Sequence, residues 1–109
     1  MINLEFNYCN INNVLVADTF IERFMGYMFR SEPHYEAIIF KPCNSIHTFF
    51  MKFNIDVLFI NSDMEIIKKV ENLKPGIIIR PIKEAKIVIE GKAGSFMSFK
   101  EGNKITISI

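Results

Sequence analysis

The chain has 109 residues, half of them hydrophobic, and its 13 basic and 12 acidic residues leave a formal net charge of +1. The apolar content excludes a disordered protein, and the near-neutral charge argues against a nucleic-acid partner. No apolar run approaches the roughly 18 residues of a membrane helix and no signal peptide is visible, so we expect no membrane contact and a cytoplasmic location. The length predicts one domain over residues 1–109.

The N-terminal segment predicts two strands. Apolar and polar residues alternate at Ile2, Leu4 and Phe6, which is the period of a half-buried strand. Tyr8 continues the same face, and a second strand candidate covers residues 12–17.

A short helix is predicted next. Thr19 is followed three residues later by Glu22, the spacing of a capping box, in which each residue satisfies a backbone amide of the other. Gly26 can end the helix in a left-handed conformation. The expected helix therefore spans residues 19–25.

The remainder of the chain predicts a succession of short strands. They cover residues 37–42, 46–53, 55–60, 65–73, 85–91 and 104–109, with a loop or edge segment at 74–81. This pattern favours an all-β fold with minor α content. We expect a small β-sandwich, jelly-roll-like, or a partly open barrel of six to eight short strands with one short helix near 19–25.

Residues 43–56, CNSIHTFFMKFNID, concentrate side chains that could carry chemistry. Successive side chains of a strand point to opposite faces. If residues 46–53 form a strand, His47 and Met51 share one face, and Cys43 is separated from them.

Three kinds of site could use this segment. Cys43, His47 and Met51 are soft ligands that suit copper(I), whereas a zinc site would consume both cysteines and both histidines of the chain. A Cys43 thiolate activated by His47 and oriented by Asp56 could act as a nucleophile. No glycine elbow accompanies the trio. The sequence favours an apolar strand with a hydrogen-bonded histidine, no metal, no cofactor and no catalysis.

Two acidic residues lie inside apolar strands. Asp56 is flanked by Ile and Val, and Glu90 ends the run IVIE. A buried carboxylate must find a partner or face water. We expect both acids to bond Arg23, Arg30 or backbone amides at a helix start, and a structural role is favoured over a catalytic one.

Five segments occur in an order that is characteristic of one family. They are VADTFIERFMGYMFR, IIFKPCNSIHTFFMKFNIDVLFI, LKPG, IVIEGKAGSF and EGNKITI. Together they resemble the DUF192 family of uncharacterised bacterial and archaeal proteins, and the second segment is similar to its subgroup with Cys-x-x-Ile-His-Thr-x-Phe-Met. Tyr27, Asn54 and Asn103 replace the Leu, Pro and Asp that are common in the family. The resemblance implies a compact, mostly β structure and no established activity.

The leading hypothesis is a small β protein that binds an unidentified small molecule or protein partner, as a monomer or weak homodimer. The candidate functional cluster contains Arg23, Arg30, Cys43, His47, Met51, Asp56 and Glu90. Two alternatives stay open: a thiol- or metal-dependent enzyme using Cys43 and His47, and a structural network in which the two arginines pair with the two acids.

Overall fold

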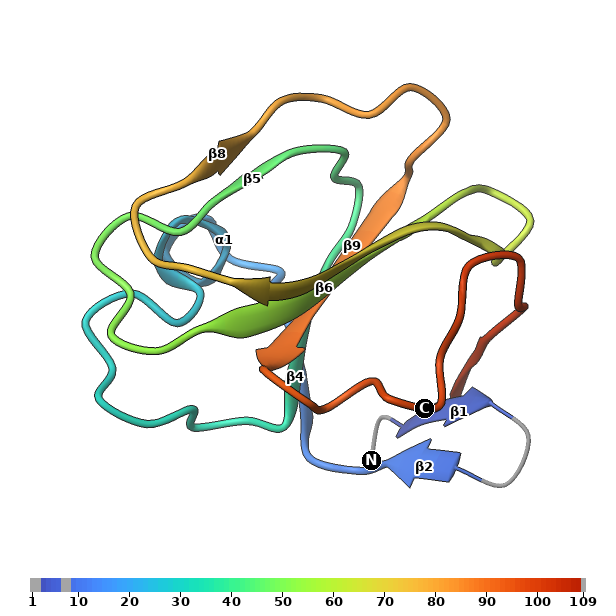
Figure 1. The fold of residues 1–109 in the computed structure, drawn as a ribbon, viewed down its shortest axis with the longest axis horizontal. Helices are drawn as coiled ribbons and strands as arrows, with labels where there is room; N and C mark the ends of the chain where they lie inside the picture. Colours follow the sequence, from blue (N-terminus) through green and yellow to red (C-terminus); the bar gives the residue numbers. More distant parts are fainter. Residues whose placement is uncertain (1–2, 7–8, 109) are drawn as a thin grey trace.

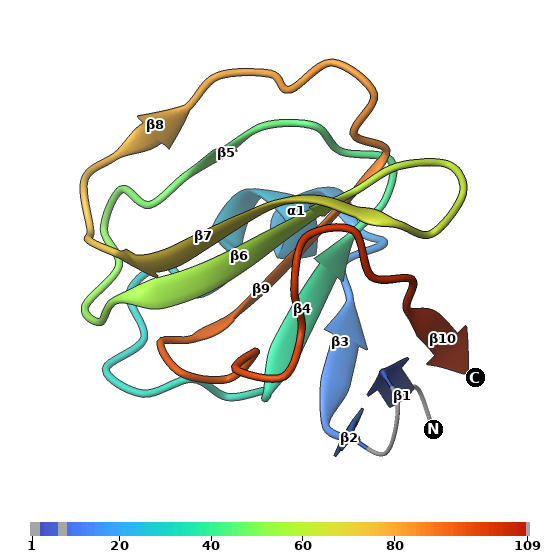
Figure 2. The same ribbon diagram turned by 45° about the vertical axis from the view of Figure 1, so that its right-hand side comes forward.

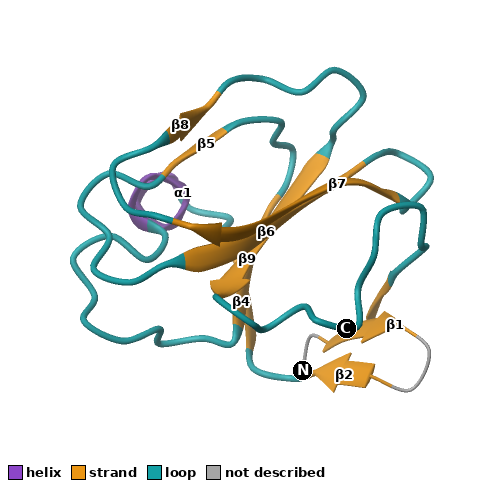
Figure 3. Ribbon diagram, viewed as in Figure 1, coloured by secondary structure: helices purple, strands orange, loops and turns teal. Residues whose placement is uncertain are grey.

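The structure, a computed structural model, describes residues 3–6 and 9–108. The described residues form ten strands and one helix: β1 (Asn3–Phe6), β2 (Cys9–Ile11), β3 (Val14–Val16), α1 (Phe20–Met25), β4 (Ala37–Phe40), β5 (Ile46–His47), β6 (Ile55–Ile60), β7 (Ile66–Leu73), β8 (Ile78–Ile79), β9 (Ile87–Lys92) and β10 (Thr106–Ser108). Many are very short and joined by long loops (Figure 3). The predicted mostly β fold with one minor helix is confirmed. Ile2, Tyr8 and Ile109, which the alternation assigns to strands, lie outside the described residues.

A five-stranded sheet in the order β3-β4-β9-β6-β7 forms the centre of the molecule. Strands β3 and β4 are parallel and are connected through α1, whereas the other neighbours are antiparallel. A small sheet β10-β1-β2 lies on one side of it, and α1 with the β5–β8 pair lies on the other (Figures 1 and 2). The sheets do not close into a barrel.

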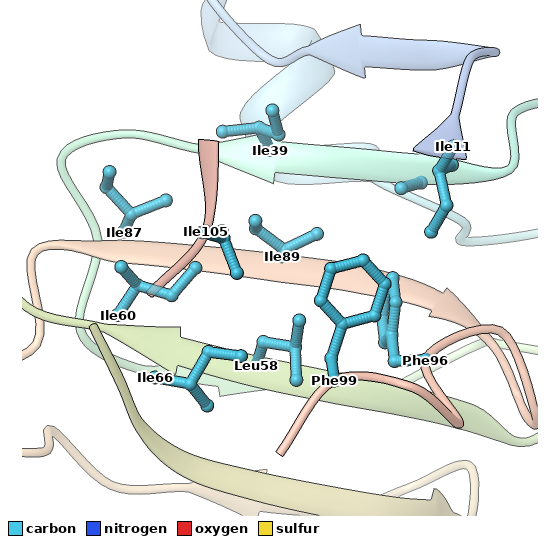
Figure 4. Close-up of a cluster of buried hydrophobic side chains, with 11 residues drawn as sticks. Ile11, Ile39, Leu58, Ile60, Ile66, Ile87, Ile89, Phe96, Phe99 and Ile105 are labelled. Carbon is cyan, nitrogen blue, oxygen red and sulfur yellow. The ribbon is translucent and has the colours of Figure 1, made fainter. Parts of the chain in front are cut away.

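Two apolar clusters cover the two faces of the central sheet. Strand β9 contributes Ile87 and Ile89 to one cluster and Val88 to the other, as alternation along a strand requires. The first cluster lies towards the small sheet and includes Phe96, Phe99 and nine smaller side chains (Figure 4). The second lies towards α1 and surrounds the candidate site described below.

The helix forms where its capping signals predict. It starts after Thr19, whose hydroxyl accepts the backbone N–H of Glu22 at 3.0 Å, while the Glu22 carboxylate accepts the N–H of Thr19 at 3.1 Å. Gly26, with a φ of 49°, ends it. No helix in the part of the chain that the structure describes is long and apolar enough to span a bilayer.

The strand predicted over residues 46–53 is wrong beyond its first two residues. Strand β5 ends at His47, and the N–H of Thr48 donates to the Ile77 carbonyl at 2.8 Å. The N–H of Met51 then bonds the Thr48 carbonyl at 3.3 Å and closes a turn that contains Phe50 at a φ of 63°. The aromatic and β-branched composition suggested a strand, but bonds to the loop before β8 fold the chain back on itself.

Candidate functional site

Glu90 lies on the α1 side of the central sheet, in the middle strand. In the register of β9 it is opposite Ile38 of β4 and Val57 of β6, two residues of the apolar cluster on that face. Its side chain is only 2% exposed, and its Oε1 atom has no hydrogen-bond partner. A Cβ atom added to Gly26 would lie 3.8 Å from Oε1, so this oxygen is directed towards the end of α1.

Burial controls the protonation of Glu90. Desolvation in the apolar cluster raises the pKa of its carboxyl group from 4.5 to about 8, because no cation or hydrogen bond offsets the loss of water. The carboxyl group is therefore mostly protonated at neutral pH. It can donate a hydrogen bond as well as accept one.

A pocket of about 120 Å³ opens beside this carboxyl group. It is called the Glu90 pocket below, and its lining comprises Arg23, Phe24, Met25, Gly26, Met28, Phe40, Cys43, Ser45, Ile46, His47, Met51 and Glu90. The chain thus brings together five of the seven residues of the predicted cluster. They come from α1, the segment before β5, β5 itself, the turn after it and β9.

Arg23 occupies the α1 side of the pocket. Its guanidinium donates hydrogen bonds to the carbonyls of Lys41 at 3.0 Å and Pro42 at 2.7 Å. These bonds fix the charge beside the segment that leads into β5, and they leave further N–H groups of the fork unused. Arg23 therefore lines the same pocket as Glu90 without pairing with it.

Cys43 also lines the pocket, which corrects the expectation that it would be separated from His47 and Met51. The separation assumed one continuous strand, whereas the turn after His47 brings Met51 back. The N–H of Cys43 is held by the Lys86 carbonyl at 2.9 Å. Its thiol donates to the Ser45 carbonyl at 3.1 Å. Burial raises its pKa, although backbone hydrogen bonding at Ser45 and Asn44 and the nearby charge of Arg23 act in the opposite direction. Both features favour the thiol over a reactive thiolate.

His47 has a defined hydrogen-bonding state. Its Nδ1 accepts the backbone N–H of Phe49 at 3.2 Å, and the two rings stack with centroids 5.4 Å apart. An accepting Nδ1 carries no proton, so the ring proton is on Nε2. The imidazole therefore offers a donor at Nε2.

Asp56 lies on the opposite face of the sheet from Glu90 and is not part of the pocket. It is opposite Gly91 in the register of β6 with β9. Its Oδ1 accepts the N–H of Asn72 and its Oδ2 accepts the N–H of Gly94, each at 2.8 Å. Asp56 does bond backbone amides, but they belong to β7 and to the segment after β9 and not to a helix start. Its inclusion in a common cluster is wrong because one residue of strand register changes the face.

Arg30 is also outside the Glu90 pocket. It lines a neighbouring hollow with His34, Tyr35 and part of α1. Among the described residues, the only ion pair is between Lys69 and Glu71 at 3.1 Å. The alternative in which Arg23 and Arg30 pair with the two acids is therefore wrong.

Several side chains at the site were not predicted. Among them, Met25, Met28 and Phe40 line the pocket. Two exposed aromatic residues are adjacent in sequence to methionines that line it: Phe29 follows Met28, and Phe50 precedes Met51. Phe29 and Phe50, 56% and 64% exposed, stack on each other with centroids 5.2 Å apart. The apolar periodicity of the sequence assigns such large side chains to the core. Only the adjacent Met-Phe and Phe-Met pairs indicated that one member lines a pocket while the other is exposed.

The described residues contain no group of three or more His, Cys, Asp or Glu side chains placed to share a metal ion. Cys43, His47 and Glu90 line one pocket but do not converge as such a group. The residues present therefore offer a polar pocket with a thiol rather than an assembled metal centre.

Comparison with known proteins gives the family. The model of the DUF192 family, described as "Uncharacterized ACR", matches residues 5–107. The chain belongs to this family. A UPF0127 protein of Pyrococcus horikoshii is 37% identical over 112 aligned positions, which cover 96% of each chain. A UPF0127 protein of Pyrococcus furiosus is 41% identical over 86 positions, covering 74% of this chain and 72% of that protein. No specific function is named for either relative.

Solved structures share the DUF192 chain's fold. A protein of unknown function from Novosphingobium aromaticivorans superposes with a TM-score of 0.77 at 20% identity, covering 96% of this chain and 82% of the other. A protein from Sinorhizobium meliloti 1021 gives a TM-score of 0.79 at 22% identity, with 97% and 91% covered. At these identities the likeness shows the fold alone.

The DUF192 segments supply much of the wall of the Glu90 pocket. The first provides Arg23, Gly26 and Met28, and the second provides Cys43, His47 and Met51, among others. Glu90 comes from the fourth. Segments far apart in sequence therefore meet at one place in the fold.

Proposed function

We propose that this protein binds a small ligand in the Glu90 pocket. The observation that carries the proposal is the Glu90 carboxyl group, which is 2% exposed, has no partner for Oε1 and lines a pocket. Buried polar atoms in native proteins are almost always hydrogen-bonded, and each exception calls for an explanation. A ligand that bonds Oε1 supplies the missing partner.

The energetics favour occupancy. An unpaired buried polar group costs about 1–3 kcal/mol, which a ligand recovers when it supplies a hydrogen bond. The fold therefore retains a destabilising group where the Glu90 pocket opens beside it. Such a concave site with a few polar groups among apolar side chains is typical of ligand pockets.

The size of the pocket limits the ligand. Its volume of about 120 Å³ is below the roughly 300 Å³ at which pockets for drug-sized molecules begin. It fits a ligand of a few heavy atoms, or one end of a larger molecule or a side chain of a partner protein. The exposed rings of Phe24, Phe49 and Phe50 would support the remainder.

Two finer assignments accompany this function. The spacing of Cys43, His47 and Met51 supports membership of the DUF192 subgroup with Cys-x-x-Ile-His-Thr-x-Phe-Met, and all three residues line the pocket. The free thiol of Cys43 supports a reducing, cytoplasmic location. The near-neutral net charge of +1 supports action without nucleic acid, and we propose a monomer or weak homodimer.

A fragment screen by nuclear magnetic resonance tests the proposal. Fragments that bind should shift the amide signals of Met28, Cys43 and His47, and Glu90→Leu should abolish their binding. The matched control is Arg30→Gln, which changes a family-motif arginine outside the pocket and should leave the affinities unchanged. Absence of any fragment at these amides, or binding that Glu90→Leu does not alter, would contradict the proposal.

A further inference from the structure

Resting on the proposed function, we infer that the Glu90 pocket selects a small monocarboxylate with a short apolar tail. The polar groups around the pocket are arranged to donate hydrogen bonds, one of them carries a permanent positive charge, and the rest of the wall is apolar. A carboxylate offers only acceptors and one negative charge, so its chemistry is complementary to this set.

His47 contributes the first donor. Because the Phe49 N–H occupies Nδ1, the proton of the imidazole is held on Nε2. Within the described part of the chain Nε2 has no hydrogen-bond partner of its own, so its N–H is free to bond an acceptor. Stacking against Phe49 fixes the plane of the ring and therefore the direction of this donor.

Arg23 contributes the charge. Two of its nitrogens are fixed by the carbonyls of Lys41 and Pro42, and the remaining N–H groups are available at the edge of the pocket. An arginine held in this way loses little conformational freedom on binding an anion. It also repels an ammonium group, which is the main alternative partner for a buried carboxyl group.

Glu90 contributes a donor at the deep end. At neutral pH its carboxyl group is mostly protonated, since its pKa is about 8. A neutral carboxylic acid held in an apolar site can donate its O–H to an anionic oxygen. An ammonium ligand could use only the carbonyl oxygen of this neutral acid, and its full pairing would require Glu90 to ionise.

The apolar wall of the pocket limits the length of the ligand's apolar tail. Met25, Met28, Met51 and Phe40 line the pocket, and methionine side chains adapt to the shape of a ligand. A cavity of about 150 Å³ holds a single benzene ring, so a volume of about 120 Å³ admits a carboxylate with a few carbon atoms. Longer chains would have to extend over the exposed ring of Phe24.

The test compares three probes of nearly equal size: propionate, propionamide and n-propylamine. Each is titrated into the isotope-labelled protein from about pH 6 to about pH 10, a range in which propionate stays ionised. We expect propionate to bind best and to shift the amide signals of Met28 and His47. Arg23→Gln should lower the affinity for propionate by about tenfold, as expected for the loss of one charged hydrogen bond. The control Arg30→Gln should leave this affinity unchanged.

The pH dependence isolates Glu90. The affinity for propionate should be constant up to about pH 8. It should then fall by up to about tenfold per pH unit as Glu90 ionises in the ligand-free protein. The other titratable groups lining the pocket are Arg23, Cys43 and His47. Tyr27, whose pKa burial raises, belongs to the same apolar cluster as Phe40 and Met51 of the pocket wall. Glu90→Gln keeps a donor and cannot titrate, so this variant should bind propionate without the fall that begins near pH 8.

The possible outcomes separate the inference from the function on which it rests. Tighter binding of n-propylamine or propionamide at the pocket, or an affinity for propionate that rises with pH, would overturn the carboxylate assignment and leave a ligand pocket. No binding of any probe or fragment at these amides would overturn both. Propionate binding that Glu90→Leu and Arg23→Gln leave unchanged would also overturn the assignment.

Discussion

The two faces of the central sheet each bury one acidic residue, and they treat it in opposite ways. Asp56 and Glu90 lie on neighbouring strands, one position out of register with each other. Asp56 accepts two backbone N–H groups at 2.8 Å, whereas Oε1 of Glu90 has no partner. The same sequence pattern, an acid inside an apolar strand, therefore yields a structural anchor on one face and an unsatisfied group on the other.

The difference arises from the groups that surround each of the two carboxyl groups. Asp56 lies near one end of β6, where Asn72 of β7 and Gly94 of the segment after β9 donate their backbone N–H groups to it. Glu90 is surrounded by Ile38, Val57 and the apolar side chains beneath α1. Burial that is compensated stabilises the fold, and burial that is not compensated costs stability and is expected where a protein functions.

The largest effect that tests this contrast is the pH dependence of stability. The carboxyl group of Glu90 keeps its proton to a pKa of about 8 when folded but loses it near 4.5 when unfolded. The stabilisation that this raised pKa contributes to the folded state is complete below pH 4.5 and is lost as pH rises through 8. Between these two pH values unfolding releases a proton, so stability falls as pH rises. The free energy of unfolding should fall by up to about 1.4 kcal/mol per pH unit there.

Chemical denaturation at a series of pH values measures this slope. Glu90→Gln removes the titrating group at constant size, so the difference between the two proteins isolates Glu90 from His34, whose pKa burial lowers. Parallel curves for the wild type and Glu90→Gln would show that Glu90 has a partner and would remove the contrast with Asp56.

Asp56→Ala is expected to have the next largest effect. It removes two part-buried hydrogen bonds in which the carboxylate accepts the backbone N–H groups of Asn72 and Gly94, and hydrogen bonds to a charged group are worth about 1.5 kcal/mol each at the lower end of their range. The free energy of unfolding should drop by about 3 kcal/mol, measured by urea denaturation, with a smaller loss in Asp56→Asn. An Asp56→Ala protein as stable as the wild type would mean that these bonds do not anchor the sheet.

The sequence predicts the helix and strands of this fold better than it predicts the long-range hydrogen bonds between them. Capping by Thr19 and Glu22 is a local signal, and the helix forms there; the apolar run 55–60 and its hairpin partner are also local. The turn after His47 depends on hydrogen bonds between Thr48 and Ile77, 29 residues apart in the chain, which composition does not encode. Local rules therefore predicted a longer strand in that place.

The candidate site divides in the same way. The resemblance and the residue types indicated Arg23, Cys43, His47, Met51 and Glu90, and these meet at one pocket. Asp56 was misassigned because the face of a strand residue depends on register, which only the paired strands define. The missing partner of Glu90 could not be predicted, since an unsatisfied atom is a property of all its neighbours together.

Thr19→Ala is expected to have the smallest effect on stability, and it tests how the Glu90 face is assembled. The substitution removes the helix cap and should cost about 1 kcal/mol. It also loosens α1, which carries Arg23, whose guanidinium bonds the carbonyls of Lys41 and Pro42 and lines the same pocket as Glu90. Urea denaturation should therefore show a small loss, whereas the affinity of the pocket for propionate should fall in the way that Arg23→Gln lowers it. Thr19→Ser keeps a capping hydroxyl and is the control. If Thr19→Ala lowers stability but leaves the affinity unchanged, the short helix does not position Arg23, and its two carbonyl bonds suffice.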